Sequence, residues 1–364
     1  MKKICLLKWV TGSVDGGEKV AVQLSNELSN FYEVHLVSIT STTPNLFFEI
    51  DDKVTYKNFI SGKHKIKNVL LKGIWMLRQY CKENDIDVIF SIGLSANIFM
   101  IGATLGLKTK TVFCEHINFK YKLSGKLGKL NRDIGVYFSD KVITLTKEDA
   151  QNYLDFYGKH LKRSKVDSIY NWIELSDYRR VYNSKSKSLV TVGRFSEQKG
   201  YDLLGKVAVE VFKEFPDWEW DIYGLKDSVI APRLHKYLEE NGVIDNVHFK
   251  GLVSGTENIY PNHAMYVMTS IYEGLPLVLL EAKQYGLPVV SFSCPTGPSE
   301  IILDGVNGYL VPEYDVDKLS RKIRQLILNQ SERINFSKNS LIGCEKFSKE
   351  KILQRWIELI EELV

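Results

Sequence analysis

Short apolar runs recur along the first half of the chain, and segments of helical periodicity separate them. Runs of this kind suit strands that are buried on both faces of a sheet, and their alternation with helices such as Glu18–Leu28 and Ile66–Cys81 predicts a doubly wound α/β fold with right-handed crossovers. We expect strands at Ile4–Leu7, Val34–Ile39, Val54–Phe59, Val88–Ile92, Thr111–Phe113, Val142–Leu145 and Asp167–Tyr170.

A second series of apolar runs follows the polar segment Asn183–Ser188 and predicts a second Rossmann-like domain. The boundary is expected between Tyr170 and Ser188, which gives domains at 1–172 and 173–347. A last helix, 348–364, carries apolar residues such as Trp356 on one face. The strands expected in the second series are Leu189–Val192, Trp218–Tyr223, Val247–Phe249, Met265–Thr269, Val289–Phe292 and Tyr309–Val311.

The segment Val88–Leu107 carries no formal charge over twenty residues, which is long enough to span a bilayer. It is rich in glycine and polar residues for a membrane helix, and VIFSI followed by SANIFMIGATLG matches a buried strand, a turn and a helix that faces the core. We therefore expect a strand and a helix here rather than a membrane span.

Composition is that of a folded globular protein, with 364 residues, 44% of them hydrophobic and 25% charged. The five cysteines are scattered and form no CxxC pair, which favours a reducing compartment and argues against a zinc site. The amino terminus, MKKICLLKWV, reads as a first strand because Lys8 interrupts its apolar run, so we expect no secretory signal and a cytoplasmic location.

The stretch Ile271–Gly286, IYEGLPLVLLEAKQYG, places two glutamates on either side of a Gly-Leu-Pro turn. With Pro276 expected at the first helical position, Glu273 lies in a loop and Glu281 about two turns into a helix. Their carboxylates would then be on the order of 12 Å apart, too far for a glycosidase acid/base pair. That spacing suits a ligand with sugar hydroxyls at one end, ribose hydroxyls at the other and a diphosphate facing the helix N-terminus. The alternative is a surface helix and a loop with unrelated glutamates.

Two further segments carry candidate chemistry at strand ends. In GRFSEQKG, Arg194 and Lys199 follow a strand and would neutralise a leaving diphosphate, although an ordinary basic loop is the alternative. In CEHIN, His116 follows another strand, at the edge where open α/β sheets bind ligands. A lone histidine is more often structural than catalytic.

Two segments resemble known ligand-binding motifs but depart from their required residues or positions. The loop TGSVDGGEK has Glu18 where a P-loop requires lysine, and its glycines do not form GxGxxG. Asp85 and Asp87 imitate a metal-binding DxD pair but precede their strand, whereas a catalytic pair should follow one. We therefore expect no metal site.

These segments, taken in order, resemble glycosyltransferase family 4, the retaining transferases of GT-B architecture. The resemblance also covers YNWI near Asn171 and CPTGPSEIILDGVNGYLVP, and it extends over nearly the whole chain. It implies two Rossmann-like domains facing a central cleft, with the last helix crossing back to the first domain. One departure is Pro276, where many members have glycine.

The resemblance also implies roles for individual residues. Arg194 and Lys199 would hold the diphosphate, Glu273 the donor sugar and Glu281 the ribose. His116 would lie near the transferred sugar and, with Glu273, Arg194 and Lys199, complete the catalytic set. The other donor-binding residues implied are Gly16, Gly17, Gly251, Val253, Gly274, Leu275, Pro276 and Leu277.

The activity expected from the resemblance is that of a hexosyltransferase. It would move a hexose (Glc, Gal or an N-acetylhexosamine) from a UDP-sugar, without a metal or other cofactor, to a lipid-linked or growing cell-surface glycan such as lipopolysaccharide or capsule. A sugar-nucleotide epimerase, a phosphorylase of the same architecture and a catalytically silent scaffold remain alternatives.

Charge is uneven along the chain. Residues 1–180 hold 27 Lys and Arg against 19 Asp and Glu, which is +8, and residues 181–364 hold 21 against 25, which is −4. The segment Phe119–Arg132 has five cations, no acid and interleaved apolar residues. It predicts either a solvated loop or peripheral binding to an anionic membrane on the inner face of the plasma membrane. We expect no nucleic-acid partner, because no binding module accompanies the patch.

Overall fold

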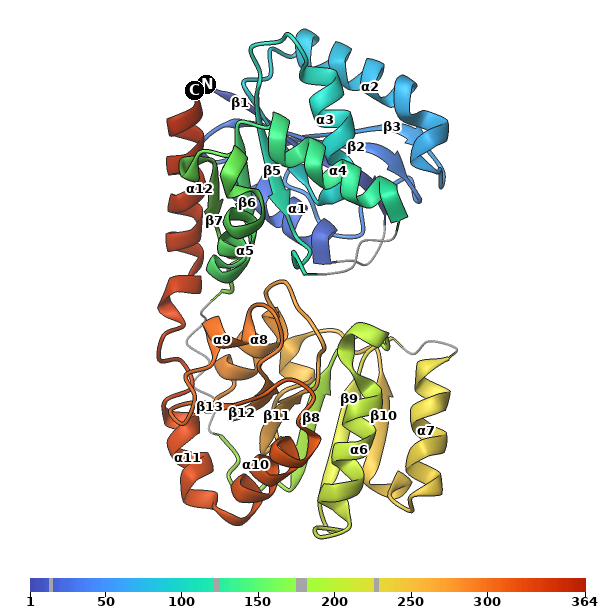
Figure 1. Cartoon of the computed structure of the whole chain (residues 1–364), viewed down its shortest axis with the longest axis vertical. Helices are drawn as coiled ribbons and strands as arrows, with labels where there is room; N and C mark the ends of the chain where they lie inside the picture. Colours follow the sequence, from blue (N-terminus) through green and yellow to red (C-terminus); the bar gives the residue numbers. More distant parts are fainter. Residues whose placement is uncertain (13–15, 121–124, 175–181, 226–228) are drawn as a thin grey trace. The chain divides into compact units, whose positions relative to one another are not determined.

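A computed structural model describes residues 1–12, 16–120, 125–174, 182–225 and 229–364 (Figure 1). The chain divides into two compact units. Unit 1 comprises Met1–Asn171 and Glu350–Val364, and unit 2 comprises Trp172–Lys349. Each contains one parallel sheet with helices packed against it, so the predicted α/β class with two Rossmann-like domains is confirmed.

The sheet of unit 1 has seven parallel strands in the order β3-β2-β1-β4-β5-β6-β7. Its strands are β1 (Lys3–Thr11), β2 (Glu33–Ser41), β3 (Val54–Ser61), β4 (Val88–Ile92), β5 (Lys110–Glu115), β6 (Lys141–Thr144) and β7 (Val166–Ser168). The helices on this unit are α1 (Gly16–Leu28), α2 (Ile66–Glu83), α3 (Asn97–Thr104), α4 (Gly125–Phe138), α5 (Lys147–Tyr157) and α12 (Lys349–Leu363).

The sheet of unit 2 has six parallel strands in the order β10-β9-β8-β11-β12-β13. Its strands are β8 (Ser188–Val192), β9 (Glu219–Tyr223), β10 (Val247–Gly251), β11 (Met265–Met268), β12 (Val289–Phe292) and β13 (Gly308–Val311). Its helices are α6 (Tyr201–Phe212), α7 (Ile230–Glu240), α8 (Leu277–Gln284), α9 (Pro298–Ile301), α10 (Val316–Leu328) and α11 (Gln330–Lys338).

The central strands are apolar because helices cover them. Every residue of β4, VIFSI, is buried, as is every residue of β12, VVSF. The uncharged segment after β4 continues as a short 3-10 turn and α3. No helix of the described residues is long and apolar enough to cross a membrane. The interpretation of Val88–Leu107 as a strand followed by a helix is therefore confirmed.

Helix α12 packs on unit 1. Trp356 meets Phe90 of β4 with ring centroids 5.7 Å apart, and Glu361 accepts hydrogen bonds from Lys2 at 2.6 Å and from Tyr32 at 2.8 Å. The buried residues of α12 are Ile352, Trp356, Leu359 and Ile360. One apolar stripe thus holds the carboxyl end of the chain against the first sheet.

Two local predictions were wrong. The strand expected at Asp167–Tyr170 is observed at Val166–Ser168, because of the expected residues only Asp167 and Ser168 pair with β6. No helix crosses between β2 and β3, although the pattern predicted regular alternation: residues 42–53, all of them described, join the two strands as loop.

The strand order places a topological switch point in each sheet. In unit 1 the switch point lies between β1 and β4, because the chain continues from β1 to β2 on one side and from β4 to β5 on the other. In unit 2 it lies between β8 and β11 for the same reason. Loops after such strands diverge, and ligands of open α/β sheets bind in the space that they leave.

Candidate active site

The loops after β8 and β11 meet at the switch point of unit 2. Lys199, at the end of the first loop, lies with its Nζ 2.7 Å from Oε1 of Glu273 in the second. The loop backbones are joined as well, since the Ile271 N–H donates to the Gln198 carbonyl at 2.8 Å and the Thr269 hydroxyl donates to the Lys199 carbonyl at 3.0 Å. The structure thus brings two predicted site residues into direct contact.

Gly200 allows the two loops to approach this closely. Its φ of +64° lies in the left-handed region, and a Cβ there would stand 2.1 Å from the Thr269 carbonyl oxygen. Any other residue would push Lys199 away from the β11 loop.

The Glu273 side chain is buried and held from several directions. Its backbone N–H donates to the Pro295 carbonyl at 2.9 Å, and the Thr296 hydroxyl donates to its carbonyl at 2.8 Å. The Gln198 amide donates to its second carboxylate oxygen at 3.4 Å. A carboxylate so placed is oriented before any ligand arrives, and Lys199 supplies its counter-charge.

Three glycines stand at the carboxyl ends of neighbouring strands in unit 2. The Gly193 N–H donates to the Tyr223 carbonyl at 2.9 Å, and the Gly224 N–H donates to the Gly251 carbonyl at 2.8 Å. A Cβ on Gly224 would be 1.9 Å from the Gly193 oxygen. At this edge of the sheet, Gly224 therefore lets the backbone after β9 pack directly against the backbone after β8. Two predicted donor residues flank this edge, the exposed Arg194 and the half-buried Val253.

Helix α8 begins at Leu277, after Gly274, Leu275 and Pro276. The prediction that Pro276 opens the helix is wrong by one residue, because it is the N-cap. Glu281 is the fifth residue of α8, so it lies just over one turn in and not two. The helix is short because Gly286, whose φ is +73°, follows its end.

Glu281 is oriented by a tyrosine that the sequence did not single out. The Tyr260 hydroxyl donates to Oε2 of Glu281 at 2.7 Å, and the Tyr260 ring stacks on Tyr285 with centroids 5.6 Å apart. Burial, followed by the negative charge of Glu281, raises the pKa of Tyr260 well above its usual value. The tyrosine therefore remains a hydrogen-bond donor at physiological pH.

Lys283 anchors α8 to α9 from the opposite side. It is fully buried, and its Nζ donates to the Ile301 carbonyl at 2.9 Å. Burial lowers the pKa of Lys283 to about 8. Keeping this charge inside the folded chain costs about 3 kcal/mol, and the cost is fully present below pH 8. It is relieved as pH rises towards 10.5, because the folded chain then binds fewer protons than the unfolded chain.

We expect Lys283→Met to be more stable than the wild type by about 1–3 kcal/mol at pH 7, because it removes this cost and loses one hydrogen bond. The advantage should disappear between pH 8 and pH 10.5. Urea unfolding of both proteins across this range measures it. The difference between them is the quantity to follow, because burial raises the pKa values of the cysteine thiols in both. A difference that stays constant with pH would contradict the assignment.

In unit 1 the predicted glycine loop opens α1, whose first residues are Gly16 and Gly17. Glu18 is buried: its carboxylate accepts hydrogen bonds from the Gly12 N–H at 2.7 Å and the Phe47 N–H at 2.9 Å. It ties the loop after β1 to the β2–β3 connection. This explains why a glutamate occupies the position where a phosphate loop would have lysine.

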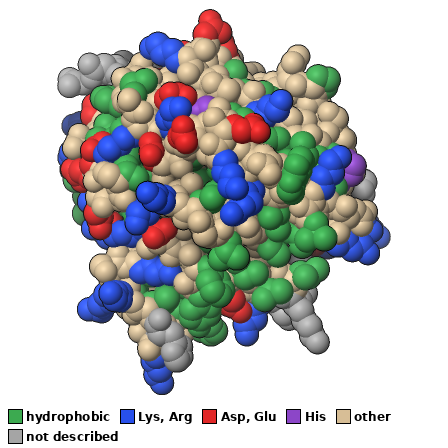
Figure 2. Space-filling model, turned by 90° about the horizontal axis from the view of Figure 1, so that it is seen from above, with side chains coloured by type: hydrophobic (Ala, Val, Ile, Leu, Met, Phe, Trp, Pro, Cys, Tyr) green, Lys and Arg blue, Asp and Glu red, His purple; other side chains and the backbone are tan. Residues whose placement is uncertain are grey.

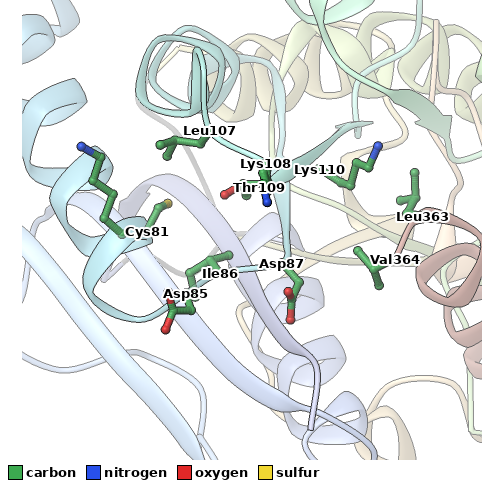
Figure 3. Close-up of a pocket in the computed structure, with 11 residues that line it drawn as sticks. Cys81, Asp85, Ile86, Asp87, Leu107, Lys108, Thr109, Lys110, Leu363 and Val364 are labelled. Carbon is green, nitrogen blue, oxygen red and sulfur yellow. The ribbon is translucent and has the colours of Figure 1, made fainter.

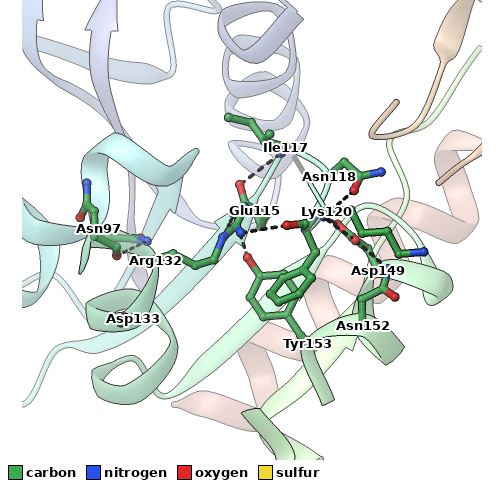
Figure 4. Close-up of polar contacts among 12 residues, drawn as sticks. Asn97, Glu115, Ile117, Asn118, Lys120, Arg132, Asp133, Asp149, Asn152 and Tyr153 are labelled. Carbon is green, nitrogen blue, oxygen red and sulfur yellow. Dashed lines mark hydrogen bonds and ion pairs between the residues drawn. The ribbon is translucent and has the colours of Figure 1, made fainter. Parts of the chain in front are cut away.

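His116 follows the last residue of β5, and a buried network holds its neighbours (Figure 4). The Glu115 carboxylate accepts hydrogen bonds from the Tyr153 hydroxyl at 2.8 Å and the Ile117 N–H at 3.1 Å. Arg132 of α4 places Nε 3.4 Å from the same carboxylate and donates from Nη1 to the Phe119 carbonyl at 2.9 Å. The loop that carries His116 is thus clamped on both sides of the histidine.

A second buried carboxylate holds the far end of this loop. Asp149 of α5 accepts from the Phe119 N–H at 3.0 Å, while the Thr146 hydroxyl caps α5 by accepting from the Asp149 N–H at 3.1 Å. Burial raises the pKa values of Asp149 and Glu115, and the charge of Arg132 opposes the shift at both. The loop that carries His116 is therefore held by two carboxylates and one arginine.

Sequence reasoning missed these supports, which include Gln198, Thr296, Tyr260, Arg132 and Asp149. Glu115 stands beside His116 in the same motif, which was the one available signal. Arg132 was interpreted only as part of a basic surface segment. Its pairing across 17 residues with Glu115 depends on how α4 packs, which local spacing does not reveal.

A pocket of about 440 Å³ lies elsewhere in unit 1, at the opposite edge of the sheet (Figure 3). Its lining includes Asp85 and Asp87, which precede β4, and Val364 at the end of the chain. Lys108, just before β5, and Lys110, the first residue of β5, also line it. Asp87 accepts a hydrogen bond from the Lys3 N–H at 2.8 Å, so this member of the DxD-like pair stabilises the start of β1.

Comparison with known families decides the identity of the chain. The model "Glycosyltransferase Family 4" matches residues 14–177, and the model "Glycosyl transferases group 1" matches residues 176–341. The chain is a glycosyltransferase that carries both of these domains. The two matched regions divide close to the boundary between the structural units, and the GT-B architecture and transferase class expected from the motifs are confirmed.

Relatives of this glycosyltransferase come from bacterial glycan synthesis. The amylovoran biosynthesis glycosyltransferase AmsD of Erwinia amylovora is 29% identical over 99% of both chains. An alpha-1,4-N-acetyl-D-galactosaminyltransferase of Campylobacter jejuni, whose name gives a PP-undecaprenol substrate, is 27% identical over 96% of this chain and 95% of its own. Anabaena HepE in complex with UDP shares the fold, with a TM-score of 0.81 and 16% identity over all of both chains.

Proposed function

We propose that this glycosyltransferase transfers a hexose from a UDP-sugar, with retention of anomeric configuration, to a hydroxyl of a growing cell-surface glycan. The observation that carries the proposal is the Lys199–Glu273 pair at the switch point of unit 2. A cation for the diphosphate and a carboxylate for sugar hydroxyls stand side by side there, and the Lys199 side chain packs against Gly193.

Catalysis would consist of positioning and electrostatic stabilisation. Arg194 and Lys199 neutralise the departing diphosphate, helped by the N-terminus of α8. Glu273 orients the donor sugar, and Glu281 accepts hydrogen bonds from the ribose. His116 acts next to the transferred sugar, and the leaving phosphate takes the proton of the acceptor hydroxyl as the new glycosidic bond forms. Gly16 and Gly17 leave room for the phosphates and the acceptor.

Support for the substrate classes comes from the relatives. A polysaccharide assembly protein, an enzyme named for an undecaprenol-linked substrate and a fold neighbour solved with UDP agree with a UDP-sugar and a lipid-linked acceptor. The test is a mass-spectrometric screen of UDP-Glc, UDP-Gal, UDP-GlcNAc, UDP-GalNAc and GDP-Man against lipid-linked acceptors. Turnover without acceptor would indicate an epimerase, a requirement for inorganic phosphate a phosphorylase, and UDP binding without product a silent scaffold.

We further expect transfer to proceed without a metal ion, because Arg194 and Lys199 take the place of magnesium at the diphosphate. Treatment with EDTA should leave the rate essentially unchanged. Loss of activity with EDTA, restored by magnesium or manganese, would overturn this account of the leaving group.

The basic segment Phe119–Arg132 was predicted to contact a membrane, and residues 121–124 lie outside the described part of the chain. Two of its members are unsuited to that role. Arg132 is buried against Glu115, and the Phe119 ring packs on Tyr153 with centroids 4.8 Å apart. The described residues that remain exposed include Lys120, Leu127 and Lys129. Any membrane contact of this segment must therefore involve fewer cations than five.

A further inference from the structure

A different part of unit 1 carries a stronger charge asymmetry. Residues 53–82 contain seven lysines and one arginine and not a single aspartate or glutamate. This run forms β3, the edge strand of the sheet, the turn after it and nearly all of α2 (Figure 1). A continuous stretch of one sign on an outer strand and helix gives that side of the unit a positive field.

Helix α2 divides into a packed face and an outer face. Its packed face meets α3 closely: a Cβ on Gly73 would stand 2.8 Å from the Phe99 ring, and one on Gly102 would stand 2.7 Å from Ile74. On the outer face, Leu71 is 82% exposed and Trp75 is 61% exposed. These two lie one turn apart, so they form a single apolar site in the middle of the exposed face.

Exposed lysines surround that apolar site. Lys67 and Lys72 flank it on α2, and Lys63 and Lys65 lie in the turn before the helix. Among the residues that the structure describes, no carboxylate lies within ion-pair distance of these four side chains. Figure 2 views the molecule from above and shows exposed hydrophobic side chains gathered in one area of that face, with basic and acidic side chains interspersed over the rest. The turn lies at the carboxyl edge of the sheet, the same edge as the His116 loop.

We propose that this surface, defined by Lys63, Lys65, Lys67, Leu71, Lys72 and Trp75, binds an anionic lipid bilayer. The lysines contact lipid headgroups, while Leu71 and Trp75 enter the interfacial layer, where tryptophan is favoured. A soluble polyanion would engage the lysines but would leave Leu71 and Trp75 in water. The apolar pair at the centre of the charge therefore favours a membrane over a free acidic polymer.

Sedimentation with vesicles tests the proposal without any sugar donor or acceptor, so its outcome is independent of the proposed function. The wild type should bind vesicles containing phosphatidylglycerol at low salt and bind phosphatidylcholine vesicles weakly. Changing Lys63, Lys65, Lys67 and Lys72 to Ser should weaken binding on the order of 600-fold, since each lysine near the surface contributes about fivefold. Leu71→Ser with Trp75→Ser should weaken it about 10-fold or more, and brominated lipid should quench the tryptophan fluorescence of the wild type more than that of this variant.

Matched controls separate this surface from general charge and apolarity. Changing Lys185, Lys206, Lys213 and Lys236 of unit 2 to Ser removes the same charge, and Val229→Ser with Leu328→Ser removes exposed apolar groups of unit 2. Both should bind as the wild type does. A third variant, with Lys120, Lys122, Lys126 and Lys129 changed to Ser, tests the basic segment Phe119–Arg132.

The proposal is overturned if the α2 lysine variant binds as tightly as the control, or if the wild type fails to bind anionic vesicles at low salt. It is also overturned if the Leu71/Trp75 variant keeps wild-type binding, because the surface would then adsorb acidic polymers of any kind. Thermal unfolding establishes that each variant is folded.

Discussion

Replacement of Arg132 by Met is expected to lower the free energy of unfolding by about 3–5 kcal/mol, because it leaves a buried carboxylate without its partner. Glu115 is 1% exposed and Arg132 6%, and the arginine also donates to the Phe119 carbonyl. The Arg132 guanidinium lies over the Phe119 ring at 5.0 Å, so the substitution also removes a cation–π contact. Chemical denaturation measures the change.

An exposed ion pair supplies the control. Arg355 and Asp167 lie 2.6 Å apart, but both are 48% exposed, so Arg355→Met should cost about 1 kcal/mol or less. Adding Glu115→Gln to Arg132→Met should recover part of the loss, since the charge left behind is then removed. Equal costs for Arg132→Met and Arg355→Met, or no recovery in the double variant, would mean that burial does not set the strength of the Glu115 interaction.

This network also shows where prediction from the sequence ends. Strands such as Val88–Ile92 and Val289–Phe292 were predicted with their observed bounds, because a short run of apolar residues between polar turns is typical of a buried strand. The fold class follows from the alternation of such runs with helices. Contacts between distant residues, such as Arg132 with Glu115, depend on helix packing and leave no periodic signal in a single sequence.

Site residues were predictable to the extent that they lie at strand ends. His116 follows β5 directly, and the loops with Lys199 and Glu273 follow β8 and β11, as the apolar runs indicated. The ion pair between Lys199 and Glu273 was not foreseen, because the two were interpreted as ligands for different parts of the donor. Their contact depends on Gly200, whose left-handed φ lets the two loops approach each other. The sequence of the GRFSEQKG motif does not by itself reveal this role of Gly200.

Lys199→Ala is expected to reduce kcat/KM about 10- to 150-fold, which corresponds to about 1.5–3 kcal/mol for a charge-assisted contact with the diphosphate. Glu273→Gln should chiefly lower turnover, and Glu281→Gln should chiefly weaken UDP binding. Calorimetric titration with UDP and steady-state rates separate the two effects. Wild-type affinity and turnover in all three variants would refute the donor-site assignment.

The Lys199–Glu273 ion pair allows a more specific prediction for double variants. Because the Lys199 ammonium is 2.7 Å from the buried Glu273 carboxylate, removing either group also changes the charge that the other presents to the donor. The effects of Lys199→Ala and Glu273→Gln should therefore combine to less than their sum, with a coupling energy of about 0.5–3 kcal/mol. Glu281 accepts from Tyr260 and shares no hydrogen bond with Lys199 among the described contacts, so Lys199→Ala with Glu281→Gln should be additive within about 0.5 kcal/mol. Additivity in both double variants would show that Lys199 and Glu273 act on the donor independently, despite their contact.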